Sequence, residues 1–159
     1  MLRYLFSIVM VVLVLASCDD SNNNDPQLSR QEQLTIDTTL INQYIAENMI
    51  QNVQVDTSSA LRYVIHEQGT GATPTFSDRV RVNYEGRLLD ETVFDEQTNS
   101  SFSVSGVIGG WQVGIQKVQE GGRITLYMPS FLGYGPFGSG ESIPPNAVLI
   151  FDIELLEVF

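Results

Sequence analysis

The sequence contains very few of the residues on which disulfide frameworks, metal centres and nucleic-acid binding depend. It has one cysteine and one histidine in 159 residues, so a single chain can form neither a disulfide nor a zinc cluster. Lysine and arginine total 8 against 19 aspartate and glutamate residues, and the formal net charge is −11. Because such an acidic chain repels phosphates, we expect no nucleic-acid partner.

The common catalytic constellations are missing too. His66 lies in a strand-like stretch with no cysteine to partner it, and the serines follow no nucleophile-elbow pattern. Gly121 and Gly122 precede a predicted strand instead of a helix, so they do not form a phosphate-binding loop. Asp152 and Glu154 alternate along another predicted strand, where a solvated face is the default interpretation. We therefore predict no metal ion, no cofactor and no paired acid and base.

The N-terminus has the pattern of a secretion signal. Arg3 precedes an apolar stretch over residues 5–15, which is too short to span a bilayer, and small residues close it as at a cleavage site. Residues 15–18, LASC, resemble a bacterial lipobox, in which the cysteine carries the lipid. The alternative is a plain signal peptide with an incidental cysteine. Because Cys18 is the only cysteine, we predict a signal peptide over 1–17 and lipidation at Cys18, which would place the protein in the bacterial cell envelope, anchored at the outer membrane and facing the periplasm or the surface.

Two segments precede the predicted domain. Residues 18–33 are polar and almost without large apolar side chains, which predicts a disordered tether. Residues 34–58 form a predicted N-terminal helical segment, with a helix over 37–50 that Asp37 or Thr38 would cap. We interpret this helix as a brace against the domain or, alternatively, as a dimerisation element. Its apolar face consists of Leu40, Ile41, Tyr44, Ile45 and Met49.

Residues 59–159 have the pattern of one compact domain. Apolar and polar residues alternate around Val82, Leu126 and Ile153, which predicts strands, and residues 110–118 have the spacing of one short helix. The predicted fold class is α+β, an antiparallel β-sheet wrapped around one short helix, with the N-terminal helix added.

One connection is longer than a hairpin needs. Residues 133–146 contain prolines that restrict the backbone, and Tyr134, Phe137 and Ile143 are poor choices for a solvated tip. Long connections of this kind are functional or disordered. We favour the wall of a binding site over a floppy connector.

Five blocks of sequence resemble one known family. They are VNYEG (82–86), TVFD (92–95), VIGGW (107–111), PSFLGYG (129–135) and IPPNAVLIFDIELL (143–156). In this order and spacing they resemble the successive signatures of FKBP-type peptidyl-prolyl cis/trans isomerases, and of bacterial cell-surface members such as the macrophage infectivity potentiators. The resemblance covers residues 59–159 and implies an FKBP-like fold and isomerase activity.

The resemblance also assigns roles by position. Trp111 matches the floor of the proline pocket, and Asp95 and Tyr134 match its carboxylate and its rim hydroxyl, the two groups expected to act in catalysis. The backbone N–H of Ile108 matches the donor to the ligand carbonyl. The implied substrate-binding residues are Tyr84, Phe94, Val107, Ile108, Trp111, Ile143 and Phe151.

The chain departs from the family pattern in three places. Residues 96–101 contain no arginine to match the basic partner that some members place beside the pocket carboxylate. Ser142 stands where a second aliphatic residue is found in other members, and Gly109 replaces a proline or arginine. These departures concern macrolide affinity and substrate preference more than catalysis.

The family resemblance implies proline-containing peptides or unfolded proteins as partners, macrolides as further ligands and no cofactor, and the lipobox at Cys18 adds the membrane through a lipid anchor. The main alternative is a non-catalytic chaperone-like or adaptor module that binds proline-containing segments. A remoter alternative is a surface lipoprotein that binds glycans, which predicts its aromatic side chains on an open face.

Overall fold

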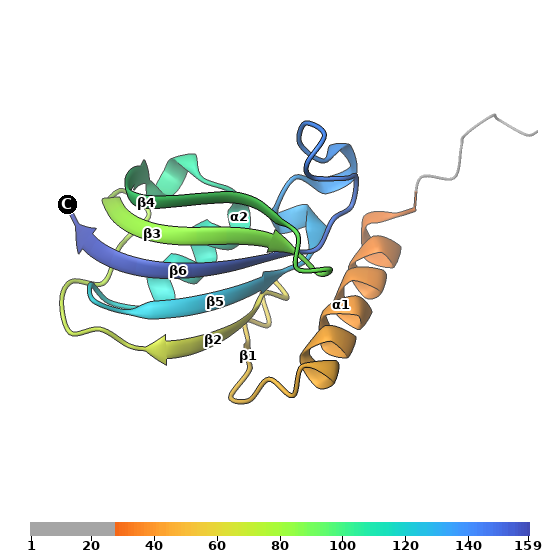
Figure 1. The fold of residues 1–159 in the computed structure, drawn as a ribbon, viewed down its shortest axis with the longest axis horizontal. Coiled ribbons are helices and arrows are strands. Elements are labelled where there is room, and N and C mark those ends of the chain that lie inside the picture. The colour runs from red at the N-terminus through yellow and green to blue at the C-terminus, as the bar shows by residue number, and fades with distance from the viewer. Residues whose placement is uncertain (1–27) are drawn as a thin grey trace, which may run out of the picture.

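The computed structural model describes residues 28–159 (Figure 1). The predicted signal peptide, the predicted lipidation at Cys18 and most of the predicted tether lie outside the described residues. Within the described part, no helix is long and apolar enough to cross a membrane.

Six strands form one antiparallel sheet in the order β1-β2-β5-β6-β3-β4. The short helix α2 (Gly109–Gly114) lies behind the sheet (Figure 1) and runs into a 3-10 turn, η2 (Ile115–Lys117). This arrangement confirms the predicted α+β fold with an antiparallel sheet around one short helix. The strands are β1 Gln54–Val55, β2 Arg62–Glu67, β3 Arg79–Leu88, β4 Val93–Ser103, β5 Arg123–Met128 and β6 Leu149–Val158.

Alternation along the strands divides the apolar side chains between the two faces of the sheet. On the α2 side, β3, β5 and β6 supply a core whose members include Val82, Leu126 and Ile153, all at most 1% exposed. The N-terminal helix α1 (Arg30–Glu47) covers part of the opposite face, where Ile41 packs with Tyr127 and Ile150. Tyr127 alternates with the core residues Leu126 and Met128 and so points to the opposite face, where it is buried because α1 lies over it.

The start of α1 corrects two predictions. The helix begins at Arg30, so residues 30–33 belong to it and not to a tether, and its N-cap is Ser29 instead of Asp37 or Thr38. Ser29 accepts a hydrogen bond from the backbone N–H of Glu32, whose carboxylate accepts one from the backbone N–H of Ser29. This capping box satisfies free N–H groups of the first turn and sets the helix start.

The end of α1 and its contacts also differ in part from the expected helical face. The helix ends at Glu47, and Met49 beyond it has a positive φ and is 78% exposed. Ile41 is fully buried and Ile45 packs beside it, whereas Leu40 is 41% exposed. The helix therefore braces the domain along Ile41, as one of the two interpretations predicted.

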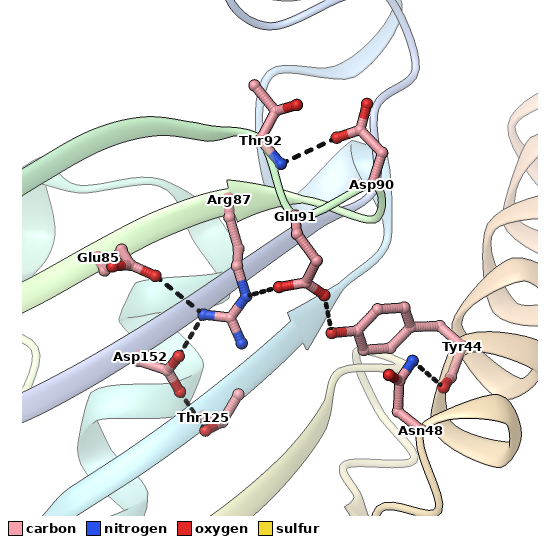
Figure 2. A network of polar contacts seen from close by, with 9 residues as sticks. All are labelled: Tyr44, Asn48, Glu85, Arg87, Asp90, Glu91, Thr92, Thr125 and Asp152. Carbon is pink, nitrogen blue, oxygen red and sulfur yellow. Dashed lines mark hydrogen bonds and ion pairs between the residues drawn. The ribbon is translucent and has the colours of Figure 1, made fainter.

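A network of polar contacts joins α1 to the sheet (Figure 2). The Tyr44 hydroxyl donates to Glu91, which lies in the β3–β4 turn and pairs with Arg87. The guanidinium of Arg87 also pairs with Asp152 and, at 3.3 Å, with Glu85. The Arg87 Nε atom is 2.9 Å from Glu91 Oε2, close enough for an ion pair although its N–H direction does not fit a hydrogen bond.

The same network corrects the interpretation of Asp152 as solvated surface. Its carboxylate is half-buried and accepts a hydrogen bond from the Thr125 hydroxyl in addition to the Arg87 ion pair. His66 Nε2 lies 2.7 Å from that same hydroxyl, on an exposed part of β2. Glu154, in contrast, is exposed as expected.

Candidate functional site

A cavity of about 350 Å³ opens on the α2 side of the sheet. Rings and aliphatic side chains form most of its wall, and the carboxylate of Asp95 and the hydroxyl of Tyr134 lie at its exposed edge. The cavity therefore combines an apolar interior with a polar rim. It is lined by Tyr84, Asp95, Phe102, Gly106, Val107, Ile108, Trp111, Tyr134 and Phe151.

Trp111 is the floor of this cavity and is 5% exposed. Three rings meet it at steep angles, with centroid distances of 5.1 Å to Tyr84, 5.8 Å to Phe102 and 5.4 Å to Phe151. Such edge-to-face contacts are favoured by the charge distribution of aromatic rings. Because each ring fixes the orientation of its neighbours, the apolar wall is formed before any ligand binds.

Two glycines set the depth of the floor. A Cβ atom on Gly110 would lie 2.6 Å from the sulfur of Met128, and one on Gly114 would lie 2.5 Å from the side chain of Leu126. Only glycine lets α2 approach β5 so closely. The VIGGW block therefore places the indole of Trp111 against the sheet, with Ile108 as the N-cap residue of the helix.

The polar rim is organised around Asp95. The Tyr84 hydroxyl donates a hydrogen bond to Asp95 Oδ2 at 2.7 Å. Burial, followed by this hydrogen bond and the negative charge of Asp95, raises the pKa of Tyr84 well above its ordinary value. Burial and then the charge of Asp95 raise the pKa of Tyr134 as well. Both hydroxyls therefore stay protonated at neutral pH and can donate to a ligand or to Asp95.

The structure brings together seven of the nine residues that the sequence nominates for catalysis and substrate binding. The other two, Phe94 and Ile143, do not line the cavity. Phe94 packs edge-on against the ring of Phe151 at 5.5 Å and so supports the wall from behind. Ile143 is 6% exposed and belongs to the core on the α2 side. The roles of all nine in binding remain predictions.

Sequence reasoning missed two lining residues, Phe102 and Gly106. Phe102 is the only aromatic residue between Glu96 and Gly106, and its isolation in a polar stretch was the available signal. The strand that holds it, β4, is an edge strand with mostly exposed side chains, so it lacks the alternation that marks a half-buried strand. Asp95 and Phe102 therefore project from a strand that the apolar pattern does not indicate.

The 133–146 loop contributes only its first part to the cavity. Tyr134 lines the wall as expected, whereas Phe137 is 87% exposed. The loop is held at its base by a hydrogen bond from Asn146 N–H to the Gly135 carbonyl at 2.8 Å, and across its middle by the Ser139–Ile143 bridge. It is thus an ordered connection that bears one wall residue.

A second and larger hollow, about 590 Å³, lies between β3, β4, β5 and β6, where charged and polar residues make up most of the lining. Glu85, Glu96, Asp152 and Glu154 contribute carboxylates, and Arg123 a single cation. Apart from Tyr84 and Ile153, its lining residues are charged or polar, so its chemistry resembles hydrated surface. The aromatic cavity is therefore the better candidate for a specific organic ligand. In residues 28–159, no three or more histidine, cysteine, aspartate or glutamate side chains converge as a metal site would require.

Comparison with known proteins gives one consistent result. Residues 71–156 match the sequence model of a family described as FKBP-type peptidyl-prolyl cis-trans isomerase. A probable FKBP-type peptidyl-prolyl cis-trans isomerase, FkpA, from Neisseria meningitidis is 44% identical over 119 residues, which are 72% of this chain and 44% of the relative. The peptidyl-prolyl cis-trans isomerase Mip of Coxiella burnetii is 38% identical over 105 residues, 64% of this chain and 46% of the relative.

A solved structure agrees with these relatives. The crystal structure of a peptidyl-prolyl cis-trans isomerase from Pseudomonas syringae has a TM-score of 0.71 and 31% sequence identity, and the match covers 82% of this chain and 96% of that one. The chain spans about half the length of the curated relatives it matches, from 44% to 58% of the first three.

Proposed function

Because the chain belongs to the family of FKBP-type peptidyl-prolyl cis-trans isomerases, we propose that it accelerates rotation about X–Pro bonds in exported or cell-envelope proteins. The observation that carries the proposal is the aromatic cavity with Trp111 as its floor and Asp95 and Tyr134 at its rim. Every residue that lines the cavity falls within the 71–156 match to the family.

The reaction can be accelerated by a catalyst that only surrounds the prolyl bond with an apolar environment. Rotation about X–Pro disrupts amide resonance, with a barrier of about 18–20 kcal/mol and spontaneous exchange over about 10–100 s. The planar amide is strongly polar and well hydrated, whereas the twisted transition state is less polar. A dry aromatic cavity therefore stabilises the twisted form relative to the planar one, which lowers the barrier.

The lining residues divide this task. The rings around Trp111 exclude water from the prolyl ring, and the backbone N–H of Ile108 would donate to the substrate carbonyl and fix its orientation. Asp95 accepts from Tyr84 and so fixes the direction of that hydroxyl. Tyr134, protonated at neutral pH, would also donate from the rim. The reaction as proposed needs no nucleophile and no proton transfer.

We place this activity at the cell envelope, on a chain attached to the outer membrane through a lipid on Cys18. The LASC sequence that ends in Cys18 and the short apolar stretch before it support this location. Substrates would then be proline-containing segments of exported proteins that are still unfolded. Macrolides, a ligand class that the family resemblance implies, would occupy the same aromatic cavity.

A protease-coupled assay tests the proposed activity. The protease cleaves only the trans form of a short prolyl peptide, so an isomerase speeds the slow phase above the spontaneous rate. The control is the same protein after heat denaturation. If the folded protein binds prolyl peptides and leaves the slow phase unchanged, the domain is a chaperone-like binding module. The rings gather in one cavity instead of an open face, which disfavours the glycan-binding alternative.

The lipid anchor is tested separately in a bacterial host that processes lipoproteins. Cys18→Ser should leave the protein unlipidated and release it from the membrane fraction, while the isomerase assay of the soluble protein is unchanged. Membrane association of the Ser variant equal to that of the parent would contradict the anchor and leave the proposed activity untouched.

A further inference from the structure

A buried carboxylate in α1 contacts the backbone just before the rim of the cavity. Asp37 is 0% exposed, and its Oδ2 atom accepts two hydrogen bonds from Ser130, at 2.8 Å from the backbone N–H and 2.6 Å from the hydroxyl. Its other oxygen accepts from the Gln33 side chain at 2.7 Å. Ser130 is itself 1% exposed. Both carboxylate oxygens thus have partners, which is the condition for burying a charge at this place.

The contacted segment leads directly to the cavity. Ser130 opens the 3-10 turn η3 (Ser130–Leu132), whose hydrogen bonds run from Leu132 N–H to the Pro129 carbonyl and from Gly133 N–H to the Ser130 carbonyl. Tyr134 follows at once. A Cβ atom on Gly133 would lie 2.7 Å from Leu149, so the backbone there is also close against β6. With so little freedom between them, a shift of Ser130 moves Tyr134.

η3 also touches the other side of the cavity. Leu132 packs against the start of α2, because a Cβ atom on Gly109 would lie 3.5 Å from both the Leu132 side chain and its carbonyl oxygen. Gly109 follows Ile108, the residue whose N–H is predicted to bind the substrate carbonyl. Outside the cavity, the Arg30 guanidinium of α1 stacks over the Phe131 ring at 4.7 Å. η3 is therefore held between α1 and the cavity.

We propose that Asp37 is a positioning residue for the aromatic cavity. By holding Ser130 it fixes η3, and through η3 it fixes Tyr134 on the rim and Leu132 against Gly109 at the start of α2. α1 is then more than a brace, because its buried carboxylate sets the geometry of the site from the opposite face of the sheet. The inference deepens the proposed isomerase function and rests on it.

Three variants of the full chain separate positioning from simple stabilisation. Asp37→Leu removes the acceptor and leaves the buried Ser130 N–H without a partner. Asp37→Asn keeps a carbonyl oxygen for Ser130, and the Gln33 amide can turn over to accept from the new NH₂ group. Tyr44→Phe is the matched control, because it removes the contact of α1 with Glu91 without touching η3.

In the prolyl peptide assay, Asp37→Leu should lower kcat/KM on the order of tenfold. Asp37→Asn should recover most of that loss, and Tyr44→Phe should leave kcat/KM unchanged even if it lowers the unfolding midpoint. In a Tyr134→Phe background the effect of Asp37→Leu should shrink, because the two changes act on the same rim group. A folded Asp37→Leu protein with the kcat/KM of the parent would overturn the inference.

Hydrogen exchange of backbone amides tests the positioning role of Asp37 without depending on isomerase activity. In Asp37→Leu, amides of residues 130–135 should exchange faster than in the parent, while those of β2 and β5 stay protected. If the parent protein has no isomerase activity, the proposed function is wrong. The positioning of residues 130–135 by Asp37 is then tested by hydrogen exchange alone. If Asp37→Leu does not fold, Ser130→Ala, which loses only the hydroxyl bond, takes its place. Unchanged exchange at 130–135 in a folded variant would sink the inference.

Discussion

The two faces of the central sheet are made from the same strands and bear opposite chemistry. On the α2 side, Trp111, Tyr84 and Phe151 leave a cavity open between their rings. On the α1 side, the helix covers Tyr127 and Ile150, and beside it the guanidinium of Arg87 neutralises carboxylates from three directions. The α2 face keeps an apolar cavity, whereas the α1 face is partly covered by the helix, is linked by ion pairs and bears the charged hollow.

The difference shows how one domain can separate ligand binding from stability. A hollow lined by rings forgoes packing contacts that a filled core would make, and in return it offers a dry site for a small apolar group. The opposite face compensates, because α1 adds a second core and a network of charged hydrogen bonds. Variants at the rim of the cavity should therefore change kcat/KM, whereas variants on the α1 face should change the unfolding free energy.

The largest effect is expected from Trp111→Ala, which removes the floor of the aromatic cavity on the α2 face. The indole is nearly fully buried, so the unfolding free energy should fall by about 3–5 kcal/mol. Isomerase activity should be lost as well, because water enters the cavity. Urea denaturation followed by far-UV circular dichroism measures the first effect, and the peptide assay below the unfolding midpoint measures the second. Stability equal to that of the parent would show that the floor is not packed as described.

Arg87→Met should produce the next largest effect, on the α1 face alone. The variant keeps an apolar stem and removes the charge that pairs with Glu85, Glu91 and Asp152, so the unfolding free energy should fall by about 1–3 kcal/mol. kcat/KM should not change. The matched control is Arg81→Met, whose exposed ion pair with Glu157 is worth at most about 1 kcal/mol. Equal losses in the two variants would mean that the network adds nothing beyond a surface ion pair.

Asp95→Leu should show the reverse pattern, a change of activity with little change of stability. Asp95 is exposed and holds the Tyr84 hydroxyl at 2.7 Å. Its loss should lower kcat/KM by about tenfold, the rate equivalent of one hydrogen bond. The aromatic wall remains and keeps part of the rate enhancement. Glu96→Leu makes the same change of charge one residue further along β4, next to the charged hollow, and should leave kcat/KM unchanged. If both variants lose activity equally, net charge and not the rim geometry is responsible.

The smallest effect is a loss of stability at alkaline pH that arises on the α1 face. Burial and then the charge of Asp152 raise the pKa of Tyr127 to about 12, whereas an unfolded tyrosine titrates near pH ~10. Because the folded pKa is raised, the stabilisation is complete below about pH 10 and is lost as pH rises toward the folded value. The urea midpoint should therefore decline over this range, and Tyr127→Phe should flatten the decline. An identical decline in the variant would assign the effect to other groups.

The fold could be predicted from the sequence wherever alternation marks a buried face. Ile124, Leu126 and Met128 alternate with Arg123 and Thr125, and β5 lies where this pattern places it. β4 could not be predicted in this way. It is an edge strand whose side chains are mostly exposed, so its polar sequence shows no alternation of apolar and polar residues.

For the candidate site, the order of the family motifs identified most of the residues that line the cavity. The residues that it misplaced or missed depend on contacts between distant parts of the chain. Phe94 stands next to the cavity residue Asp95 in the sequence yet packs against the ring of Phe151, and Ile143 belongs to the core; both placements depend on side-chain packing and not on spacing. Asp37 is a residue type that often caps helices, but its hydrogen-bond partner Ser130 is 93 residues away in the sequence. A local pattern cannot indicate a contact between such distant residues, whereas the capping box of Ser29 and Glu32 that starts α1 is a local pattern that the sequence did offer.

The position of β6 has a consequence for the order of folding. This strand is the last in the sequence, yet it lies between β5 and β3 and pairs with both. Until it is available, β3 and β4 can form only an isolated hairpin beside β2 and β5, and neither half has its central neighbour. Pairing of Val80 with Val158 closes a very long loop, which makes the step slow. A nascent chain would therefore stay loosely structured until β6 has been synthesised and can pair with β3 and β5.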